Sequence, residues 1–94
     1  MTMVSRTAIV RNSLGIHARA AARFVHAATQ FQSHIRVARG ERVIDGKSIM
    51  GVLLLAASRG TSLVVSADGP DAEQAVDSLC LLIETGLGEE PCSV

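Results

Sequence analysis

Residues 12–25 read NSLGIHARAAARFV, and the change of pattern inside this stretch decides how the chain begins to fold. The stretch opens with turn-forming residues, and Gly15 allows a backbone turn that a side chain would oppose. Apolar residues then recur at helical spacing, which predicts a helix over residues 18–29. Its predicted apolar face consists of Ala21, Phe24, Val25 and Ala28. The stretch therefore predicts a turn that enters a helix at His17.

On either side of this stretch the chain alternates between strand and helix patterns. The predicted elements are a strand over 3–11, the helix over 18–29, a hairpin over 34–45 with strands HIRVAR and RVID, a helix over 48–58, a strand over 61–67 and a helix over 69–86. Three amphipathic helices need an apolar surface to cover. The sequence therefore predicts an α+β fold, an open-faced β-sandwich. In it, three helices lie on one face of a four-stranded antiparallel sheet, in βαββαβα order.

Size and composition indicate one small domain. The chain has 94 residues, of which 48% are hydrophobic and 19% charged, so we expect a single domain over 1–88 and a frayed tail over 89–94. Phe24 and Phe31 are the only aromatic residues, which argues against a nucleic-acid-binding surface. No apolar run reaches the length of a membrane span, and no secretion signal opens the chain. We expect a cytoplasmic protein.

The cysteines and histidines outside the first helix start show no ligand pattern. Cys80 falls on an apolar helical stripe, so we expect a buried thiol rather than a disulfide with Cys92. His26 and His34 do not combine with Cys80 in any metal-ligand spacing. The sequence predicts no metal site.

Charge is divided unevenly along the chain. Residues 1–47 hold eight Lys and Arg against two acidic residues, whereas residues 48–94 hold Arg59 alone against seven. One interpretation is that the two halves neutralise each other across the domain. The other is a positive field around His17 that attracts anions or acidic partners.

His17 is the residue best suited to take part in a reaction. At the N-cap it would be followed by Ala18, Arg19 and Ala20, whose backbone N–H groups point out of the helix end. An anion there is stabilised by these donors, by the helix dipole and by the Arg19 guanidinium. A neutral imidazole keeps a lone pair and can act as a nucleophile. The alternative is an exposed histidine that serves only as a modest helix cap.

Two motifs together resemble the HPr family of phosphocarriers of the bacterial phosphoenolpyruvate-dependent sugar phosphotransferase system. They are NSLGIHARAAARFV at 12–25 and GKSIMGVLLLAASRGTSLVVSADGPDAEQAV at 46–76, and the resemblance covers about residues 4–88. It implies that His17 accepts phosphate on Nδ1 from enzyme I and passes it to IIA-type proteins, with Arg19 beside the phosphate. It also implies a covalently modified carrier without a cofactor, rather than an enzyme.

One residue departs from the family's usual His-Ala-Arg-Pro-Ala pattern. Ala20 stands where proline is common. The exchange is physically mild because proline lacks a backbone N–H, and in the first turn of a helix this N–H has no helical partner. Alanine variants are also similar to nitrogen-related, regulatory relatives of HPr. The alternative function is therefore a phosphorylation-dependent interaction module that plays no part in sugar uptake.

Ser48 opens the second predicted helix. The preceding glycines do not have the spacing of a nucleotide-binding P-loop, and Ser48 fits an N-cap. The resemblance implies a second role, regulatory phosphorylation by an HPr serine kinase/phosphorylase, which would weaken docking to the acidic surface of enzyme I.

The same helix start is expected to contact partners. Helical spacing favours a core position for at least some of Ile49, Met50 and Leu53, and for Leu53 above all. The resemblance implies instead that these residues form an apolar docking patch beside His17, with Arg19 and Arg23 as its charged rim. We expect the protein to be a monomer and its docking to partners to be transient.

Overall fold

A computed structural model describes residues 3–88 of the chain. Its elements are β1 (Met3–Ile9), α1 (Ala18–Ala28), β2 (His34–Arg39), β3 (Arg42–Asp45), α2 (Ile49–Leu54), β4 (Ser62–Asp68) and α3 (Ala72–Glu84). This is the predicted βαββαβα order. The tail over 89–94, which was expected to fray, and Cys92 within it lie outside the described residues.

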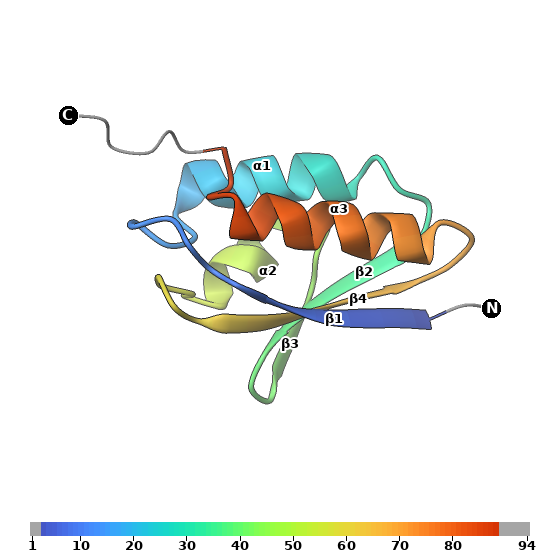
Figure 1. Cartoon of the computed structure of the whole chain (residues 1–94), viewed down its shortest axis with the longest axis horizontal. Coiled ribbons are helices and arrows are strands. Elements are labelled where there is room, and N and C mark those ends of the chain that lie inside the picture. Colours follow the sequence, from blue (N-terminus) through green and yellow to red (C-terminus); the bar gives the residue numbers. More distant parts are fainter. Residues whose placement is uncertain (1–2, 89–94) are drawn as a thin grey trace.

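The four strands form one antiparallel sheet in the order β1-β4-β2-β3. All three helices lie on the same side of this sheet (Figure 1). Side chains of β4 alternate between buried and more exposed, as expected when only one face of a sheet is covered. The predicted open-faced β-sandwich is confirmed.

The core lies between the sheet and the helices. Phe24 of α1 and Leu79 and Ile83 of α3 are almost completely buried. The face of α1 predicted from helical spacing is confirmed, because Ala21, Phe24, Val25 and Ala28 are all buried. On α3 the buried residues include Ala72, Val76, Leu79 and Ile83, which recur at the same helical spacing. Cys80 is also buried, as expected, and loss of hydration raises the pKa of its thiol.

Residues 3–88 contain neither a membrane-spanning helix nor a cluster of metal ligands. No helix in this part of the chain is long and apolar enough to cross a membrane. These residues also bring no three His, Cys, Asp or Glu side chains together as a metal-binding group.

The prediction for the second helix was wrong at its C-terminal end. The sequence predicts a helix to residue 58, but α2 ends at Leu54. The Arg39 and Arg42 side chains donate hydrogen bonds to the carbonyls of residues 54–56, and Ala56 has φ 48°, in the left-handed region. An alanine in that conformation cannot continue a right-handed helix, so the long-range contacts end it early.

The other boundaries differ by fewer residues. The first strand ends at Ile9 instead of residue 11, and the last helix begins at Ala72 instead of residue 69. Asp71 occupies the N-cap of α3 but makes no side-chain capping bond. Its carboxylate is used elsewhere in the fold.

Asp71 joins the turn before α3 to the turn before β2. Its carboxylate accepts hydrogen bonds from the backbone N–H of Gln32 and of Ser33, both at 2.9 Å, and from the Ser33 hydroxyl at 2.5 Å. The hydroxyl of Ser33, followed by the amide of Gln32, holds the pKa of the Asp71 carboxyl below its usual value of 3.8. Two turns far apart in sequence are thus fastened by one ionised side chain.

Gly15 shapes the loop that leads to His17. Its φ of +68° lies in the left-handed region, and a Cβ built there would lie 2.5 Å from the carbonyl oxygen of Ala57. The next residue, Ile16, donates its backbone N–H to the same carbonyl at 2.9 Å. The segment after α2 therefore fixes the entrance to α1, and it approaches too closely for any side chain at position 15.

Replacing Gly15 by alanine tests this close approach, with Gly40→Ala as the matched control. Both glycines have positive φ, but nothing lies within 4 Å of a Cβ at Gly40. We expect Gly40→Ala to lower the free energy of unfolding by about 1 kcal/mol, and Gly15→Ala by about 2 kcal/mol more. Urea unfolding measures both, and equal losses would contradict the packing described for Gly15.

Replacing Asp71 by asparagine tests the junction between the two turns. Because the folded-state pKa is lowered, the ionised carboxylate stabilises the fold above the unfolded pKa. This contribution is lost as pH falls through the folded pKa. We expect Asp71→Asn to be less stable than the parent at neutral pH, with the difference shrinking below pH 3.8. Unfolding free energies measured across this range check it, and a pH-independent difference would count against the carboxylate.

Candidate functional site

His17 occupies the N-cap of α1. Its backbone is extended, with φ −88° and ψ −176°, and its carbonyl accepts the N–H of Ala21 at 2.8 Å. The ring nitrogen Nδ1 accepts the backbone N–H of Arg19 at 3.2 Å. The residue is half-buried, not fully exposed. The predicted N-cap is confirmed, and the imidazole itself is the capping group.

The capping bond fixes which ring nitrogen carries the lone pair. A backbone amide can only donate, so Nδ1 must accept with its lone pair. In the neutral ring the proton is then on Nε2. The nucleophilic nitrogen therefore faces the positive end of the α1 dipole.

The residues predicted to support an anion are placed unequally around this ring. Arg19 is exposed in the first turn of α1, and Ala18 is exposed beside it. Ala20 is only 1% exposed, so its side chain belongs to the core and only its backbone faces the helix start. Arg23 is exposed but also donates a 3.4 Å hydrogen bond to the carbonyl of Leu87, which joins α1 to the segment that follows α3.

Asn12, which was not among the predicted site residues, contributes to the loop. It is 7% exposed, and its side-chain amide donates to the carbonyl of Gly15 at 2.5 Å. The bond holds the turn whose far end carries His17. The signal in the sequence was an asparagine at the start of a glycine turn, where its side chain commonly bonds to the backbone.

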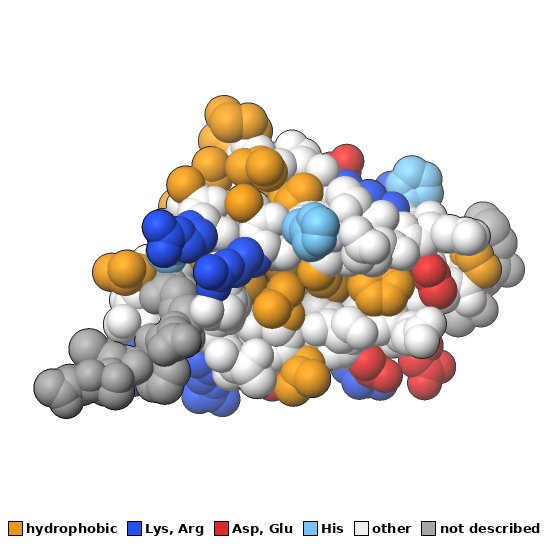
Figure 2. Space-filling model, turned by 90° about the horizontal axis from the view of Figure 1, so that it is seen from above, with side chains coloured by type: hydrophobic (Ala, Val, Ile, Leu, Met, Phe, Trp, Pro, Cys, Tyr) orange, Lys and Arg blue, Asp and Glu red, His pale blue; other side chains and the backbone are white. Residues whose placement is uncertain are grey.

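Exposed apolar residues gather on α2. Ile49 is 44% exposed and Met50 68%, whereas Leu53 is partly buried against the core. The partial burial of Leu53 agrees with the core position favoured from helical spacing, and its docking role stays a prediction. Leu54 is 57% exposed and was not predicted as part of this exposed apolar group, because it lay in the middle of the longer predicted helix. Figure 2 shows hydrophobic side chains gathered beside Lys and Arg on the helix-bearing side of the molecule.

Ser48 is the N-cap of α2, as predicted. Its hydroxyl oxygen accepts the backbone N–H of Gly51 at 3.1 Å. Ser48 directly precedes the exposed Ile49 and Met50 in the chain. A modification of this hydroxyl would therefore alter the same surface.

The described residues also settle how the charges pair. Among residues 3–88, one ion pair joins the basic and acidic halves, between Arg6 and Asp77. This pair links the two halves directly, and their neutralisation across the whole domain stays a prediction. Arg19 and Arg23 stay exposed on α1.

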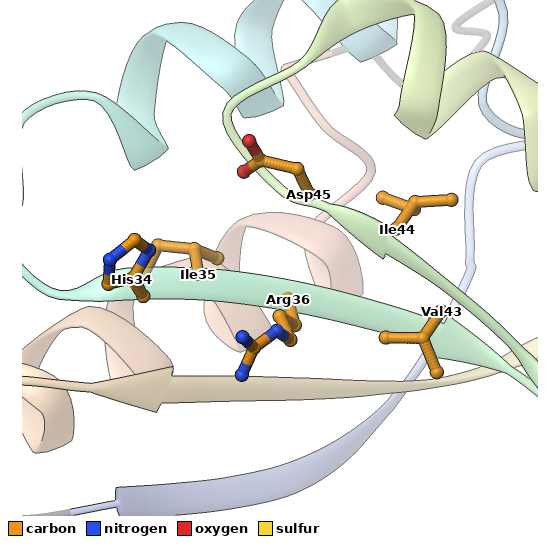
Figure 3. Close-up of a pocket in the computed structure, with 6 residues that line it drawn as sticks. All are labelled: His34, Ile35, Arg36, Val43, Ile44 and Asp45. Carbon is orange, nitrogen blue, oxygen red and sulfur yellow. The ribbon is translucent and has the colours of Figure 1, made fainter.

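A hollow of about 250 Å³ lies apart from His17, between β2 and β3 (Figure 3). His34, which lines the hollow, follows the C-terminal end of α1. His17 lies at the other end of α1, just before the helix starts. The lining of the hollow includes two residues of opposite charge, Arg36 and Asp45.

The comparisons with known proteins agree on one family. The model described as "PTS HPr component phosphorylation site" matches residues 4–85. The phosphocarrier protein HPr of Cupriavidus necator is 42% identical over 93% of this chain and 98% of its own. The phosphocarrier protein NPr of Shewanella violacea is 33% identical over 95% of this chain and 98% of its own.

A solved structure adds the fold. The crystal structure of HPr from Thermoanaerobacter tengcongensis matches with a TM-score of 0.84 and 41% identity, and covers 97% of this chain and 100% of that one. The related sequences, the matching fold and the histidine at the helix start all indicate the same family. The chain belongs to the HPr family, the phosphocarrier proteins of the phosphotransferase system.

Proposed function

We propose that His17 is the phosphoacceptor, that it receives the phosphoryl group on Nδ1 from enzyme I, and that it passes the group to a IIA-type protein. The single observation that carries this proposal is the hydrogen bond from the Arg19 amide to Nδ1. It keeps a lone pair on this nitrogen at the entrance of a helix, where an incoming anion is stabilised.

The transfer balances without a cofactor. The Nδ1 lone pair forms a bond to phosphorus, the bond from phosphorus to the donor breaks, and its electron pair returns to the donor. Nε2 keeps its proton during the attack. Because the lone pair is then used, Nδ1 can no longer accept the Arg19 N–H, and this donor becomes available to a phosphoryl oxygen.

The surroundings give the phosphoryl group moderate stabilisation. The backbone N–H groups of Ala18, Arg19 and Ala20, the α1 dipole and the exposed Arg19 guanidinium all favour negative charge. Ala18 and Arg19 are exposed, so the group would stay in contact with solvent. A carrier needs this balance, because a phosphohistidine bound too strongly would not be passed on.

The docking surface is proposed to combine the start of α1 with α2. Ile49 and Met50 supply apolar contact, and flexible Met50 suits a surface that fits several partners. Arg19 and Arg23 supply a basic rim for acidic partner surfaces. We propose that the protein works as a monomer in the cytoplasm, through small and transient interfaces with enzyme I and IIA-type proteins.

Replacing His17 by alanine tests the phosphoacceptor. With phosphoenolpyruvate and enzyme I, we expect the parent protein to acquire an acid-labile phosphate and His17→Ala to acquire none, because His17 supplies the imidazole that caps α1. His26→Ala is the matched control, since His26 is exposed on the same helix, and it should label like the parent. Undiminished labelling of His17→Ala would refute the proposal.

The same labelled protein separates the two branches of the family. The HPr relative is 42% identical and the NPr relative 33%, which favours the sugar branch. The phosphorylated protein should therefore donate to a sugar-type IIA. Transfer to a nitrogen-type IIA alone would favour the regulatory alternative instead.

We also propose that Ser48 is a regulatory phosphorylation site for an HPr serine kinase/phosphorylase. Phosphate adds negative charge directly before Ile49 and Met50, inside the proposed docking surface. An acidic partner would be repelled, so docking and transfer to His17 would weaken.

The Ser48 proposal predicts two measurements. A purified kinase of this type should label the parent protein but not Ser48→Ala, and the phosphorylated form should accept phosphate at His17 about tenfold more slowly. Ser48→Ala also removes the capping bond to Gly51, at a cost of about 1 kcal/mol. Unfolding of Ser48→Ala therefore serves as the control for stability. Equal labelling of Ser48→Ala would exclude the site.

A further inference from the structure

Arg39 and Arg42 face each other across the β2–β3 hairpin. They are direct partners in the strand register, at the last and first positions of the two strands. Their side chains reach the end of α2, so both extend to the helix-covered side of the sheet. Like charges at directly opposed positions destabilise a sheet, and this pair therefore needs a compensating group.

The carbonyl groups at the end of α2 provide part of that compensation. Nη1 of Arg39 donates to the carbonyls of Leu55 at 2.8 Å and Ala56 at 3.0 Å, and Nη1 of Arg42 donates to that of Leu54 at 2.6 Å. Each guanidinium uses one nitrogen in these bonds, although it carries five N–H donors. The bonds fix both side chains in place and leave further donors for another acceptor.

A hollow of about 260 Å³ opens at this position. It is lined by Arg39, Arg42, Leu55 and Ala56, with no carboxylate among them. Neither arginine belongs to an ion pair within residues 3–88. The hollow thus combines two fixed positive charges with a small apolar wall.

We propose that Arg39 and Arg42 form a binding site for a small phosphate-bearing anion, either inorganic phosphate or a phosphomonoester. Guanidinium groups match the geometry of phosphate oxygens, and a pair already held by protein carbonyls loses little freedom on binding. The volume is below the usual range of about 300–1,000 Å³ for ligand pockets, which favours a small ligand.

This site is separate from the entrance of α1 but shares a neighbour with it. Ala56 lines the hollow, and the next residue, Ala57, accepts the N–H of Ile16 just before His17. A ligand at the arginine pair would therefore change the surroundings of Ile16 indirectly. Direct binding is recognised by effects on the two arginines and on residues 54–56.

Titration of the unphosphorylated protein with inorganic phosphate, followed by two-dimensional NMR at constant ionic strength, tests the site. We expect saturable shifts of the Arg39 and Arg42 signals and of the amides of residues 54–56. Arg42→Gln should weaken this binding by about tenfold, since it removes one of two charge-assisted contacts. Arg36→Gln is the matched control, because Arg36 lies on the same strand but does not line the hollow, and it should bind like the parent.

The set of signals that shift in the parent protein tests the proposal even if a variant unfolds. Shifts confined to residues 17–23 would place phosphate only at the α1 entrance and overturn the proposal. Equal affinity of Arg42→Gln and the parent for the arginine-pair signals would also overturn it. Arg19→Gln should leave the shifts at residues 54–56 intact, which separates this site from the proposed phosphoacceptor site.

Discussion

The hydrogen bond from the Ile16 amide to the Ala57 carbonyl is the contact on which the rest of the site depends. It joins the loop before α1 to the segment after α2, which are far apart in sequence. Gly15 has to be glycine because Ala57 and Ser58 approach it too closely for a Cβ. The direction of α1, and with it the position of the imidazole, follows from this contact.

Both helices that border the proposed docking surface begin at a side chain with chemistry of its own. His17 caps α1 through Nδ1, and Ser48 caps α2 through its hydroxyl. In each case the atom that stabilises the helix start is the atom proposed to carry phosphate. Modification therefore exchanges a capping bond for a charge at a helix entrance, so a local covalent change alters a surface.

The uneven distribution of charge along the sequence is also seen in where the arginine side chains lie. Arg19 and Arg23 remain exposed on α1, while Arg39 and Arg42 are fixed against the end of α2. Within residues 3–88 the acidic half supplies one ion-pair partner, Asp77. Among residues 3–88, Arg19, Arg23, Arg39 and Arg42 therefore form no ion pair, which leaves a local positive field on this part of the chain.

The sequence by itself determined the local features of this protein. The order of the elements, the apolar faces of the helices and both N-caps are visible in it, because each depends on spacing or on neighbours along the chain. His17 and Arg19 were singled out because the helix start and the family motif coincide at them. These features cover nearly the whole fold and the residues proposed for the centre of the site.

Only the tertiary structure decided what depends on distant partners. The strand order β1-β4-β2-β3, the carboxylate of Asp71 bound by another turn, and the early end of α2 had no local signal. The residues after Leu54 have helical propensity, but the bonds from Arg39 and Arg42 and the left-handed Ala56 outweigh it. Propensity is worth fractions of a kcal/mol per residue, so a few long-range hydrogen bonds suffice to override it.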